Sequence, residues 1–434
     1  MRRLAGGLCL VVLLSSSAAP GQDPAAREEL RNLRVKAAEA HRAKDWPALL
    51  ETTRKLRALD PNRPGNLYNL ACAEALNGHM VAAARLLRDL LDRGIDFGIE
   101  EDADLATARA SDAFAPVLKR AAENRRPQGG SEVAFRLLER DLLTEGIAYD
   151  PVTRAFFVSS VHRRKIVRRS AAGNVSDFVR EGQDGLEAVL GLAVDWRGRV
   201  LWACSAAMPQ MRGYEPALEG STALFAYDLK TGRLLRRLAL PRFGQAHVLN
   251  DLTLAENGDV YASDSVGSGI YVARVAADTL EEFVAPGVFR SPQGLVFSSG
   301  GERLYVADWS VGLFSVDVKT RKREEVVPFP GLALLGVDGL VRYRGDLVVI
   351  QNMLRPHRVV RLRLDPSGAR VAHATILDQS DPEFLEPTLA TVVDEDLYVV
   401  GKSQWGRFDE KTGAVDETRL VPPAILKIPL RPAS

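Results

Sequence analysis

A short apolar phrase recurs six times between residues 145 and 390, and its first residue is polar in five of the six copies. The six first residues are Glu145, Leu190, Asn250, Gln293, Asp338 and Glu386. Three of them are acids, which is unexpected if the phrase only builds a hydrophobic core. These side chains offer oxygen donors without a Cys or His cluster. That chemistry favours a hard cation, Ca²⁺ or else Mg²⁺ or Mn²⁺, rather than zinc.

Three carboxylates that converge on one place repel each other. At about 8 Å and an effective dielectric of about 20, each pair costs roughly 2 kcal/mol. Protonation of one acid or binding of a cation relieves the repulsion. The alternative for Glu145 and Asp338 is that neighbouring backbone amides hold the carboxylates. Glu386 precedes Pro387 and can equally be a solvated loop acid.

A second set of polar residues lies close to later apolar runs, and it adds candidates for substrate contacts and proton transfer. The expected substrate contacts are His162, Asp264, Asn352, Glu386 and Lys402. We expect Asp338 to ligate the cation and also act as a base, with His247 or Asp308 orienting the substrate or shuttling a proton. The alternative for Asp264 and Asp308 is that they cap turns.

The elements that must position these residues are short strands. From residue 131 onward, short runs of Val, Phe, Tyr and Leu are broken by Gly, Asp and Pro. Successive phrases begin 45, 60, 43, 45 and 48 residues apart. Such periods predict a β-propeller with four strands per blade. If each phrase opens the innermost strand of its blade, the six first residues meet at one mouth of the central channel.

The strand count predicts how the ring closes. The sixth repeat ends after its third strand near Leu430, and one apolar run is left over at residues 133–138. We therefore expect residues 133–138 to pair with residues 424–430 in a composite last blade, which leaves no open edge. The spacing of 60 marks an insertion over residues 205–220, which we interpret as a candidate lid.

Residues 25–124 form a predicted helical domain, and residues 125–130 a Pro- and Gly-containing linker to the propeller at 131–434. A period of 34 relates Ala37 to Ala71, and Pro61 closes the first unit. This pattern resembles the tetratricopeptide repeat. The resemblance implies a groove for a peptide or partner protein. The alternative is a helical appendage that packs on the next domain.

The first 21 residues have the pattern of a signal peptide, with Arg2 and Arg3 before a short apolar stretch at 4–14. We expect cleavage near Ala19 or Gly21, export to the periplasm or the extracellular space, and no stable membrane insertion afterwards; an uncleaved anchor is the alternative. Lys and Arg number 57 against 56 Asp and Glu, so no net field recruits nucleic acid.

The segment 131–434 resembles the regucalcin–gluconolactonase family of six-bladed propellers, whose members include senescence-marker-like proteins. Glu145 in Thr-Glu-Gly, Asn250 in Leu-Asn-Asp and Asp338 in Val-Asp-Gly match the family's motifs. The resemblance implies one divalent cation at the channel mouth, held by Glu145, Asn250, Gln293 and Asp338. Gln293 stands where the family has an Asn ligand, and its side chain is one methylene longer, so the metal must shift or be lost.

Two functions from different classes follow. In the first, a divalent cation polarises a lactone or ester carbonyl and lowers the pKa of a bound water for hydrolysis. In the second, the propeller binds a small-molecule ligand or a protein without chemistry, and the helical repeats serve as an adaptor. Lyase or isomerase chemistry on the same scaffold is a third class.

Overall fold

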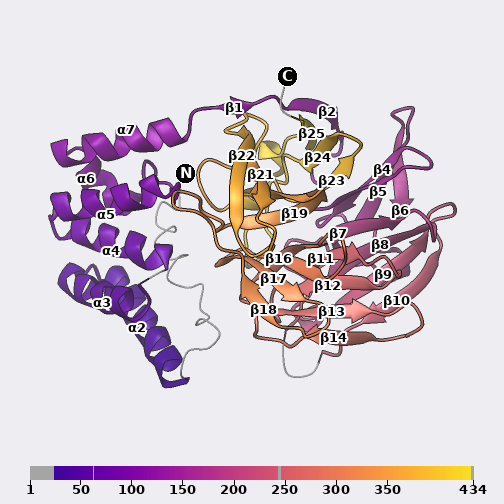
Figure 1. Cartoon of the computed structure of the whole chain (residues 1–434), viewed down its shortest axis with the longest axis horizontal. Helices are drawn as coiled ribbons and strands as arrows, with labels where there is room; N and C mark the ends of the chain where they lie inside the picture. Colours follow the sequence, from indigo (N-terminus) through magenta and orange to yellow (C-terminus); the bar gives the residue numbers. More distant parts are fainter. Residues whose placement is uncertain (1–23, 62, 243–245, 432–434) are drawn as a thin grey trace. The chain divides into compact units, whose positions relative to one another are not determined.

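The computed structural model describes residues 24–61, 63–242 and 246–431, which divide into two compact units (Figure 1). The first unit holds the described residues up to Arg126 together with the short segments 329–333 and 353–356. The second unit holds the remainder of the described chain. The predicted signal peptide, residues 1–21, lies outside the described residues. None of the described helices is long and apolar enough to cross a membrane.

The first unit is helical, as predicted. Its elements are α2 (Pro24–Ala43), α3 (Trp46–Leu59), α4 (Pro64–Leu76), α5 (Met80–Asp92), η1 (Ala103–Leu105), α6 (Ala106–Arg109), η2 (Asp112–Phe114) and α7 (Ala115–Asn124). The Asp45 carboxylate accepts the Ala48 N–H and caps α3. Ala37 and Ala71 are both fully buried. Their burial explains the small side chains, while the tetratricopeptide assignment stays a prediction.

The second unit is a ring of six antiparallel sheets, which confirms the six-bladed propeller. The first blade has β3 (Ile147–Asp150), β4 (Ala155–Ser160), β5 (Lys165–Arg169) and β6 (Val175–Val179). The second has β7 (Ala188–Asp195), β8 (Val200–Ala206), β9 (Thr222–Asp228) and β10 (Leu234–Ala239). The third has β11 (Leu249–Leu254), β12 (Val260–Asp264), β13 (Gly269–Ala273) and β14 (Leu280–Val284).

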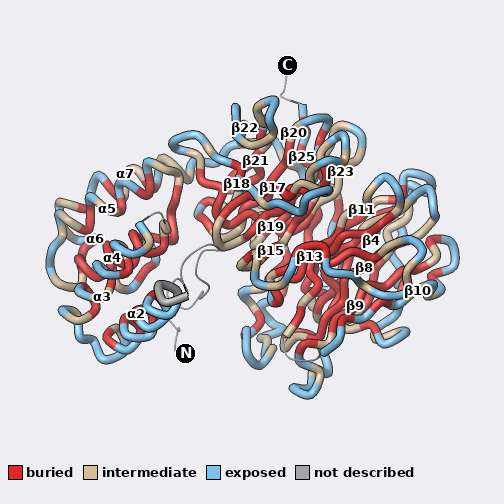
Figure 2. The backbone as a smooth tube through the Cα atoms, turned by 60° about the horizontal axis from the view of Figure 1, so that its bottom comes forward, coloured by how far each residue is buried: buried red, intermediate tan, exposed pale blue. Residues whose placement is uncertain are grey.

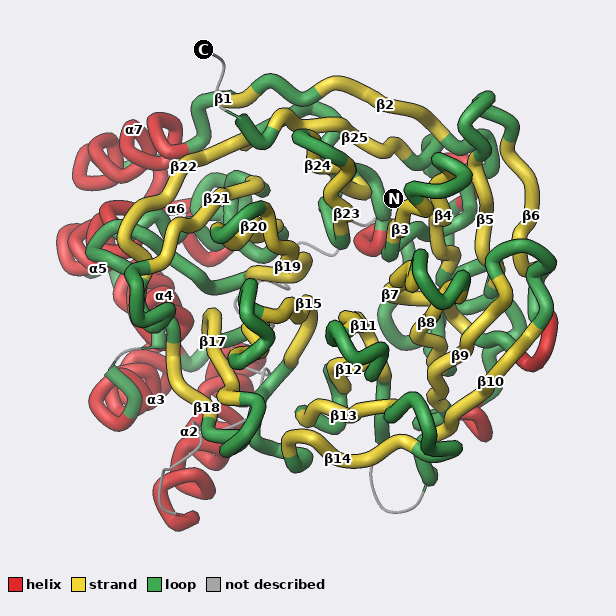
Figure 3. Tube along the Cα trace, turned by 45° about the vertical axis from the view of Figure 1, so that its right-hand side comes forward, coloured by secondary structure: helices red, strands yellow, loops and turns green. Residues whose placement is uncertain are grey.

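The last three blades continue the ring. The fourth has β15 (Pro292–Phe297), β16 (Arg303–Asp308), β17 (Gly312–Asp317) and β18 (Arg323–Glu325). The fifth has β19 (Val337–Tyr343), β20 (Asp346–Gln351), β21 (Arg358–Leu364) and β22 (Val371–Gln379). The sixth has β23 (Ala390–Val393), β24 (Asp396–Val400) and β25 (Ala424–Pro429). Figure 3 shows the first strand of each blade nearest the centre of the ring.

The ring closes as the strand count predicts. Strand β2 (Glu132–Arg136) pairs antiparallel with β25, and Val133 lies opposite Leu426. Just before it, β1 (Gln128–Gly129) pairs with β22 of the fifth blade. The segment expected to be a linker therefore contributes a short strand of its own, and one stretch of chain joins the outer edges of two adjacent blades.

The apolar core of the propeller lies between neighbouring blades. Strands β4 and β12 are buried along their whole length, which is why each begins with consecutive apolar residues rather than an alternating pattern. Phe157 and Ile166 of the first blade, for example, share one cluster with Leu201 and Phe225 of the second. Figure 2 shows that buried backbone follows the strands while exposed backbone follows the turns.

The glycine at the second position of the phrase has a steric cause. A Cβ on Gly146 would lie 2.3 Å from the Leu190 carbonyl oxygen of the next blade. A Cβ on Gly339 would lie 2.5 Å from the Thr388 carbonyl oxygen. In the copies that have glycine here, the innermost strands approach each other too closely for a side chain, whereas the third copy has Asp251 and the sixth has Pro387. The glycine of the phrase recurs for this steric reason, whereas the first residue of the phrase differs from copy to copy.

Candidate functional site

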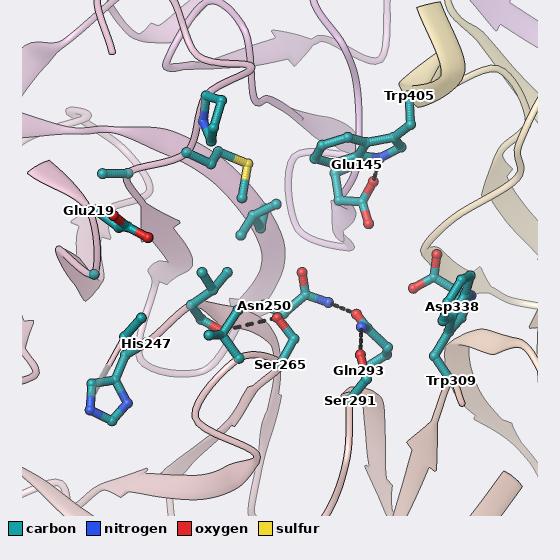
Figure 4. A pocket seen from close by; sticks show the side chains of 18 of the residues that line it. Glu145, Glu219, His247, Asn250, Ser265, Ser291, Gln293, Trp309, Asp338 and Trp405 are labelled. Carbon is teal, nitrogen blue, oxygen red and sulfur yellow. Dashed lines mark hydrogen bonds between the residues drawn. The ribbon is translucent and has the colours of Figure 1, made fainter. Parts of the chain in front are cut away.

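All six first residues of the phrase line a single cavity of about 570 Å³ in the propeller. Leu190, Asn250, Gln293 and Asp338 lie within the innermost strands of their blades, and Glu145 and Glu386 lie just before theirs. The antiparallel register places them at the same end of the ring. Figure 4 shows Glu145, Asn250, Gln293 and Asp338 around one space. The structure therefore brings together the four residues that the sequence suggested as cation ligands.

Two carboxylates form the floor of this cavity. Glu145 is 4% exposed and Asp338 is 7% exposed. Burial raises the pKa of Glu145 well above its usual range, and the nearby Asp338 charge adds to the rise. Burial likewise raises the pKa of Asp338 to about 6. No Lys, Arg or His among the described residues lies within ion-pair distance of either carboxylate.

Each floor carboxylate accepts one recorded side-chain hydrogen bond from the described residues. The Trp405 indole Nε1 donates to Glu145 Oε2 at 2.6 Å, and Asn352 Nδ2 donates to Asp338 Oδ2 at 2.5 Å. Asn352 is itself held, because its Oδ1 accepts from Trp309 Nε1 at 2.8 Å and its Nδ2 also reaches the Pro387 carbonyl at 3.0 Å. These bonds fix the direction of the carboxylates without neutralising their charge.

Two amides lie between the carboxylates. Asn250 Nδ2 donates to Gln293 Oε1, and Gln293 Nε2 donates to Ser291 Oγ at 2.9 Å (Figure 4). The extra methylene of Gln293 thus allows a chain of side-chain hydrogen bonds across the floor. The Gln293 oxygen is engaged by Asn250 in this arrangement, whereas the Asn250 oxygen accepts no protein hydrogen bond that the structure records among the described residues.

The floor fits a hard divalent cation in charge and in donor type. Two ionised carboxylates would match its charge, and amide oxygens and waters would complete the oxygen shell that Ca²⁺ prefers. No group of three or more His, Cys, Asp or Glu side chains with metal-binding geometry occurs in the described part of the chain. Glu145 and Asp338, with Asn250 or Gln293 as neutral donors, are the residues that would hold a cation here.

The predicted insertion lies between β8 and β9 and forms one wall of the cavity. Met208, Pro209, Tyr214 and Glu219 line it, whereas Met211 is buried in the core between blades. The insertion packs against a long segment between β24 and β25, because a Cβ on Gly413 would lie 1.9 Å from the Pro209 carbonyl oxygen. That second segment carries Trp405, which also lines the cavity.

Sequence reasoning missed Trp405 and Trp309, although both contact the residues that orient the floor. A signal for Trp405 existed, since the second and third apolar runs of the last repeat are much farther apart than in most others. Trp309 directly follows a strand of the regular repeat, so no irregularity in the sequence marked it as a site residue. Asp251 was also missed: it is buried next to Asn250, and burial raises its pKa to about 7.

Two predicted site residues hold loops instead of lining the cavity. Asp308 accepts the N–H groups of Arg290 at 2.7 Å and of Ser291 and Ser310 at 3.3 Å. Asp264 accepts the N–H groups of Val248 at 2.9 Å and of Gly267 at 2.8 Å. Both carboxylates are fully buried. The arrangement matches the alternative interpretation, in which these aspartates cap turns.

The remaining candidates divide in the same way. His247 lines the cavity, but its Nδ1 lies 2.5 Å from Asp264 Oδ2 and its ring points away from Asn250 and Glu145 in Figure 4. His162 contacts the Gln210 carbonyl oxygen at 2.7 Å, and Lys402 forms an ion pair with Glu383 at 2.8 Å. Neither His162 nor Lys402 lines the cavity, whereas Asn352 and Glu386 do.

Comparison with known proteins finds solved structures that are similar to this chain. No family model and no curated protein matches the sequence. Similar solved structures include a gluconolactonase from Xanthomonas campestris, 17% identical, covering 68% of this chain and 89% of that one with a TM-score of 0.46. Luciferin-regenerating enzyme is 14% identical over 70% and 95%, with a TM-score of 0.49. Virginiamycin B lyase from Staphylococcus aureus is 14% identical over 70% and 100%, with a TM-score of 0.46.

Proposed function

We propose that the propeller binds one divalent cation, Ca²⁺ by preference, between Glu145 and Asp338, and that it hydrolyses a small lactone or ester in the cavity above. One observation carries the proposal. Two buried carboxylates face the same cavity and have raised pKa values, with no cationic side chain to pair with them in the described chain. Uncompensated buried charge of this kind is characteristic of a binding site rather than of a core.

Proton transfer in this proposal belongs to Asp338. A bound cation would supply Lewis acidity for the carbonyl and would acidify a bound water. Asp338 would accept a proton from the attacking water and return it to the departing alkoxide. Asn352 holds Asp338 Oδ2, which leaves Oδ1 turned to the reacting groups. Asn250 lies beside both and is the candidate for positioning the substrate oxygen.

The walls would exclude water and select the substrate. Trp405, Trp309 and Tyr214 present aromatic carbon to the cavity from separate segments of the chain. Closely packed aromatic walls lower the local dielectric, which strengthens the interaction of the floor carboxylates with a cation. His247 and Asp308 have no catalytic part in this proposal, because each is committed to holding loops.

Binding without catalysis is the second candidate function. It is favoured by the Asn250–Gln293–Ser291 hydrogen-bond chain, which occupies two of the neutral donors, and by the direction of the His247 ring. A propeller of this kind would hold a ligand over the cation and release it unchanged. Export and a protein partner for the helical unit remain predictions that are compatible with both candidates.

A lactone and ester panel assayed with and without chelator tests the proposal. We expect hydrolysis that depends on Ca²⁺, a thermal shift on addition of Ca²⁺, and loss of both in Asp338→Asn. The control is Asp394→Asn, because Asp394 is exposed and has a positive φ of 55° that Asn also tolerates. Ca²⁺ binding without turnover of any ester would support the second candidate, and no Ca²⁺ response in the wild type would overturn the cation site.

A further inference from the structure

A second cavity, which we term the interblade groove, lies between the fifth and the sixth blade of the propeller. It has a volume of about 930 Å³ and shares no lining residue with the candidate site. Strands β20, β21 and β22 of the fifth blade line one side, and residues 429–431 at the end of β25 line the other. Gly129 and Gly130 complete the lining, where the chain passes from β1 to β2 (Figure 3).

The outer edge of β22 is open beside the interblade groove. At one end of this edge, β1 pairs with Asp378 and Gln379. At the other end, Val327 forms a parallel bridge with Arg370. Between these two contacts, residues 372–377 have β21 as their only strand neighbour in the described part of the chain. An open edge offers main-chain N–H and C=O groups to an added strand, and β1 shows that this edge accepts one.

Two basic side chains stand next to this open edge. Arg363 of β21 and His373 of β22 are direct cross-strand neighbours, both are exposed, and both line the groove. No hydrogen bond or ion pair joins either side chain to another described residue. Arg361, two residues before Arg363, is engaged instead, because it donates to Asp346 Oδ2 at 2.6 Å and to the Leu430 carbonyl oxygen at 2.8 Å. Arg363 and His373 are therefore available to a ligand that enters the groove.

Basic residues on other outer strands are engaged by the protein itself. Arg236 of β10 donates to the Arg274 carbonyl oxygen at 3.4 Å, and Arg323 of β18 donates to the Val288 carbonyl oxygen at 2.7 Å. Strand β22 is also longer than either of them, with nine residues against six and three. The groove thus combines a long open edge, an adjoining space and available basic side chains.

These charges indicate which kind of strand the edge can accept. Two copies of this chain joined through their β22 edges would bring two Arg363 guanidinium groups toward each other, and like charges on neighbouring strands are destabilising. Charge on an edge strand is a general protection against self-association. A strand that carries carboxylates would instead meet complementary charge.

We propose that the interblade groove binds an extended acidic segment of a partner protein, which adds a strand to the outer edge of β22 and directs its carboxylates to Arg363 and His373. Neighbouring strands lie about 4.8 Å apart, so the added strand lies next to His373 and about 10 Å from the β21 backbone, a distance that a long Arg side chain largely spans. Carboxylates at alternate positions share one face of a strand and can all point into the groove. This inference does not depend on the proposed function of the candidate site.

Short labelled peptides test the inference by fluorescence anisotropy with the full chain at low salt. The first peptide has eight residues in which Glu alternates with Thr, and the second has Gln in place of every Glu. We expect the Glu peptide to bind roughly tenfold more tightly, because only its carboxylates form ion pairs with the groove. A third peptide keeps every Glu but is N-methylated at its four central amides. It should lose binding, because it cannot donate main-chain hydrogen bonds to the edge.

The double variant R363Q/H373Q identifies the source of the charge preference. Both positions are exposed, so the substitutions leave the core of the blade intact. We expect the variant to bind the Glu and Gln peptides equally, with the affinity for the Gln peptide unchanged from the wild type. Arg233→Gln is the matched control, because Arg233 is an exposed residue between β9 and β10 that does not line the groove.

Three results would overturn the inference. The first is equal affinity of the wild type for the Glu and Gln peptides, or a preference that persists in the double variant. The second is full binding of the N-methylated peptide, which would mean that no strand is added. The third is a concentration-dependent dimer of the wild type, seen by sedimentation, that the Glu peptide disperses, because it would assign the edge to a second copy of the chain.

Discussion

Glu145 and Asp150 stand at opposite ends of strand β3, and both carboxylates are almost completely buried, at 4% and 1% exposure. Their pKa values nevertheless move in opposite directions. Burial would by itself raise the pKa of Asp150, but hydrogen bonds from Arg199, Thr153 and the Val152 N–H together lower it to about 2. Burial raises the pKa of Glu145, and nearby carboxylates add to the rise; among the described residues its carboxylate accepts one recorded side-chain hydrogen bond, from the Trp405 indole.

The difference shows that burial alone does not mark a functional acid. Arg199 meets Asp150 with two nitrogens, each at 2.7 Å, and so provides both charge and geometry. The floor of the cavity has the same burial without the counter-charge. The candidate-site residue Glu145 thus differs from the structural acid Asp150 in its counter-charge and not in its burial.

Removal of the counter-charge from Asp150 should have the largest effect. We expect Arg199→Met to lower the free energy of unfolding by about 3–5 kcal/mol at pH 7, because an ionised buried carboxylate is left unpaired. Urea unfolding measures the loss. Arg197→Met is the control, since Arg197 is exposed and lies over the Trp196 ring at 5.0 Å. A loss below about 1 kcal/mol for Arg199→Met would contradict the comparison.

Removal of a floor charge should act in the opposite direction. The pKa of Asp338 is about 6 when folded, above its ordinary value of about 3.9, so its ionisation destabilises the fold as pH rises through this range. In chelator at pH 7.5 we expect Asp338→Asn to raise the free energy of unfolding by roughly 2 kcal/mol. The gain should be almost gone near pH 4, where Asp338 is protonated in the folded state and about half protonated in the unfolded state.

Asp338→Asn also shows whether the predicted change in the free energy of unfolding has the wrong sign. Urea unfolding in chelator at pH 7.5 and pH 4 gives both values for the wild type, Asp338→Asn and the control Asp394→Asn. A variant less stable than the wild type at pH 7.5 would mean that Asp338 has a stabilising partner and resembles Asp150. In that case the uncompensated-charge argument for the cation site fails.

The smallest expected effect concerns the pH dependence of the cation itself. A bound cation requires ionised Glu145 and Asp338, so protons compete with it wherever these carboxyls are protonated in the free protein. We expect the Ca²⁺ affinity to fall at least about tenfold between pH 6 and pH 5, because Asp338 titrates near 6 and Glu145 above its usual range. Calorimetry across pH 5–8 measures this, and a flat profile would exclude these two ligands.

The repeated phrase predicted the ring and the meeting of its six first residues, because each blade needs the same inner strand. It also predicted closure through residues 133–138, since one strand was left over. It did not separate Asp308 from Asp338: both are buried acids close to one strand end, and only the partners of each distinguish them. Those partners come from loops that do not repeat.

Trp405 and Glu219 escaped prediction for a related reason. Both lie in segments present in one blade only, so no second copy in the chain indicates where they point. Gln293 shows the limit in a third way. The sequence showed that Gln293 stands where the resembled family has an Asn. It did not show the hydrogen bond between Gln293 and Asn250, which depends on how far the two side chains reach across the floor. Residues fixed by the repeat were predictable, and residues fixed by a single loop were not.

The composite blade has a consequence for synthesis of the chain. Strand β2 leaves the ribosome long before its partner β25, which follows about 290 residues later. At roughly 5–20 residues per second, that interval lasts roughly 15 to 60 seconds. During it the apolar residues Val133 and Phe135 have no strand to pair with. The seam that closes the ring can therefore form only after β25 has emerged, and until then β2 is an unpaired apolar strand that can aggregate.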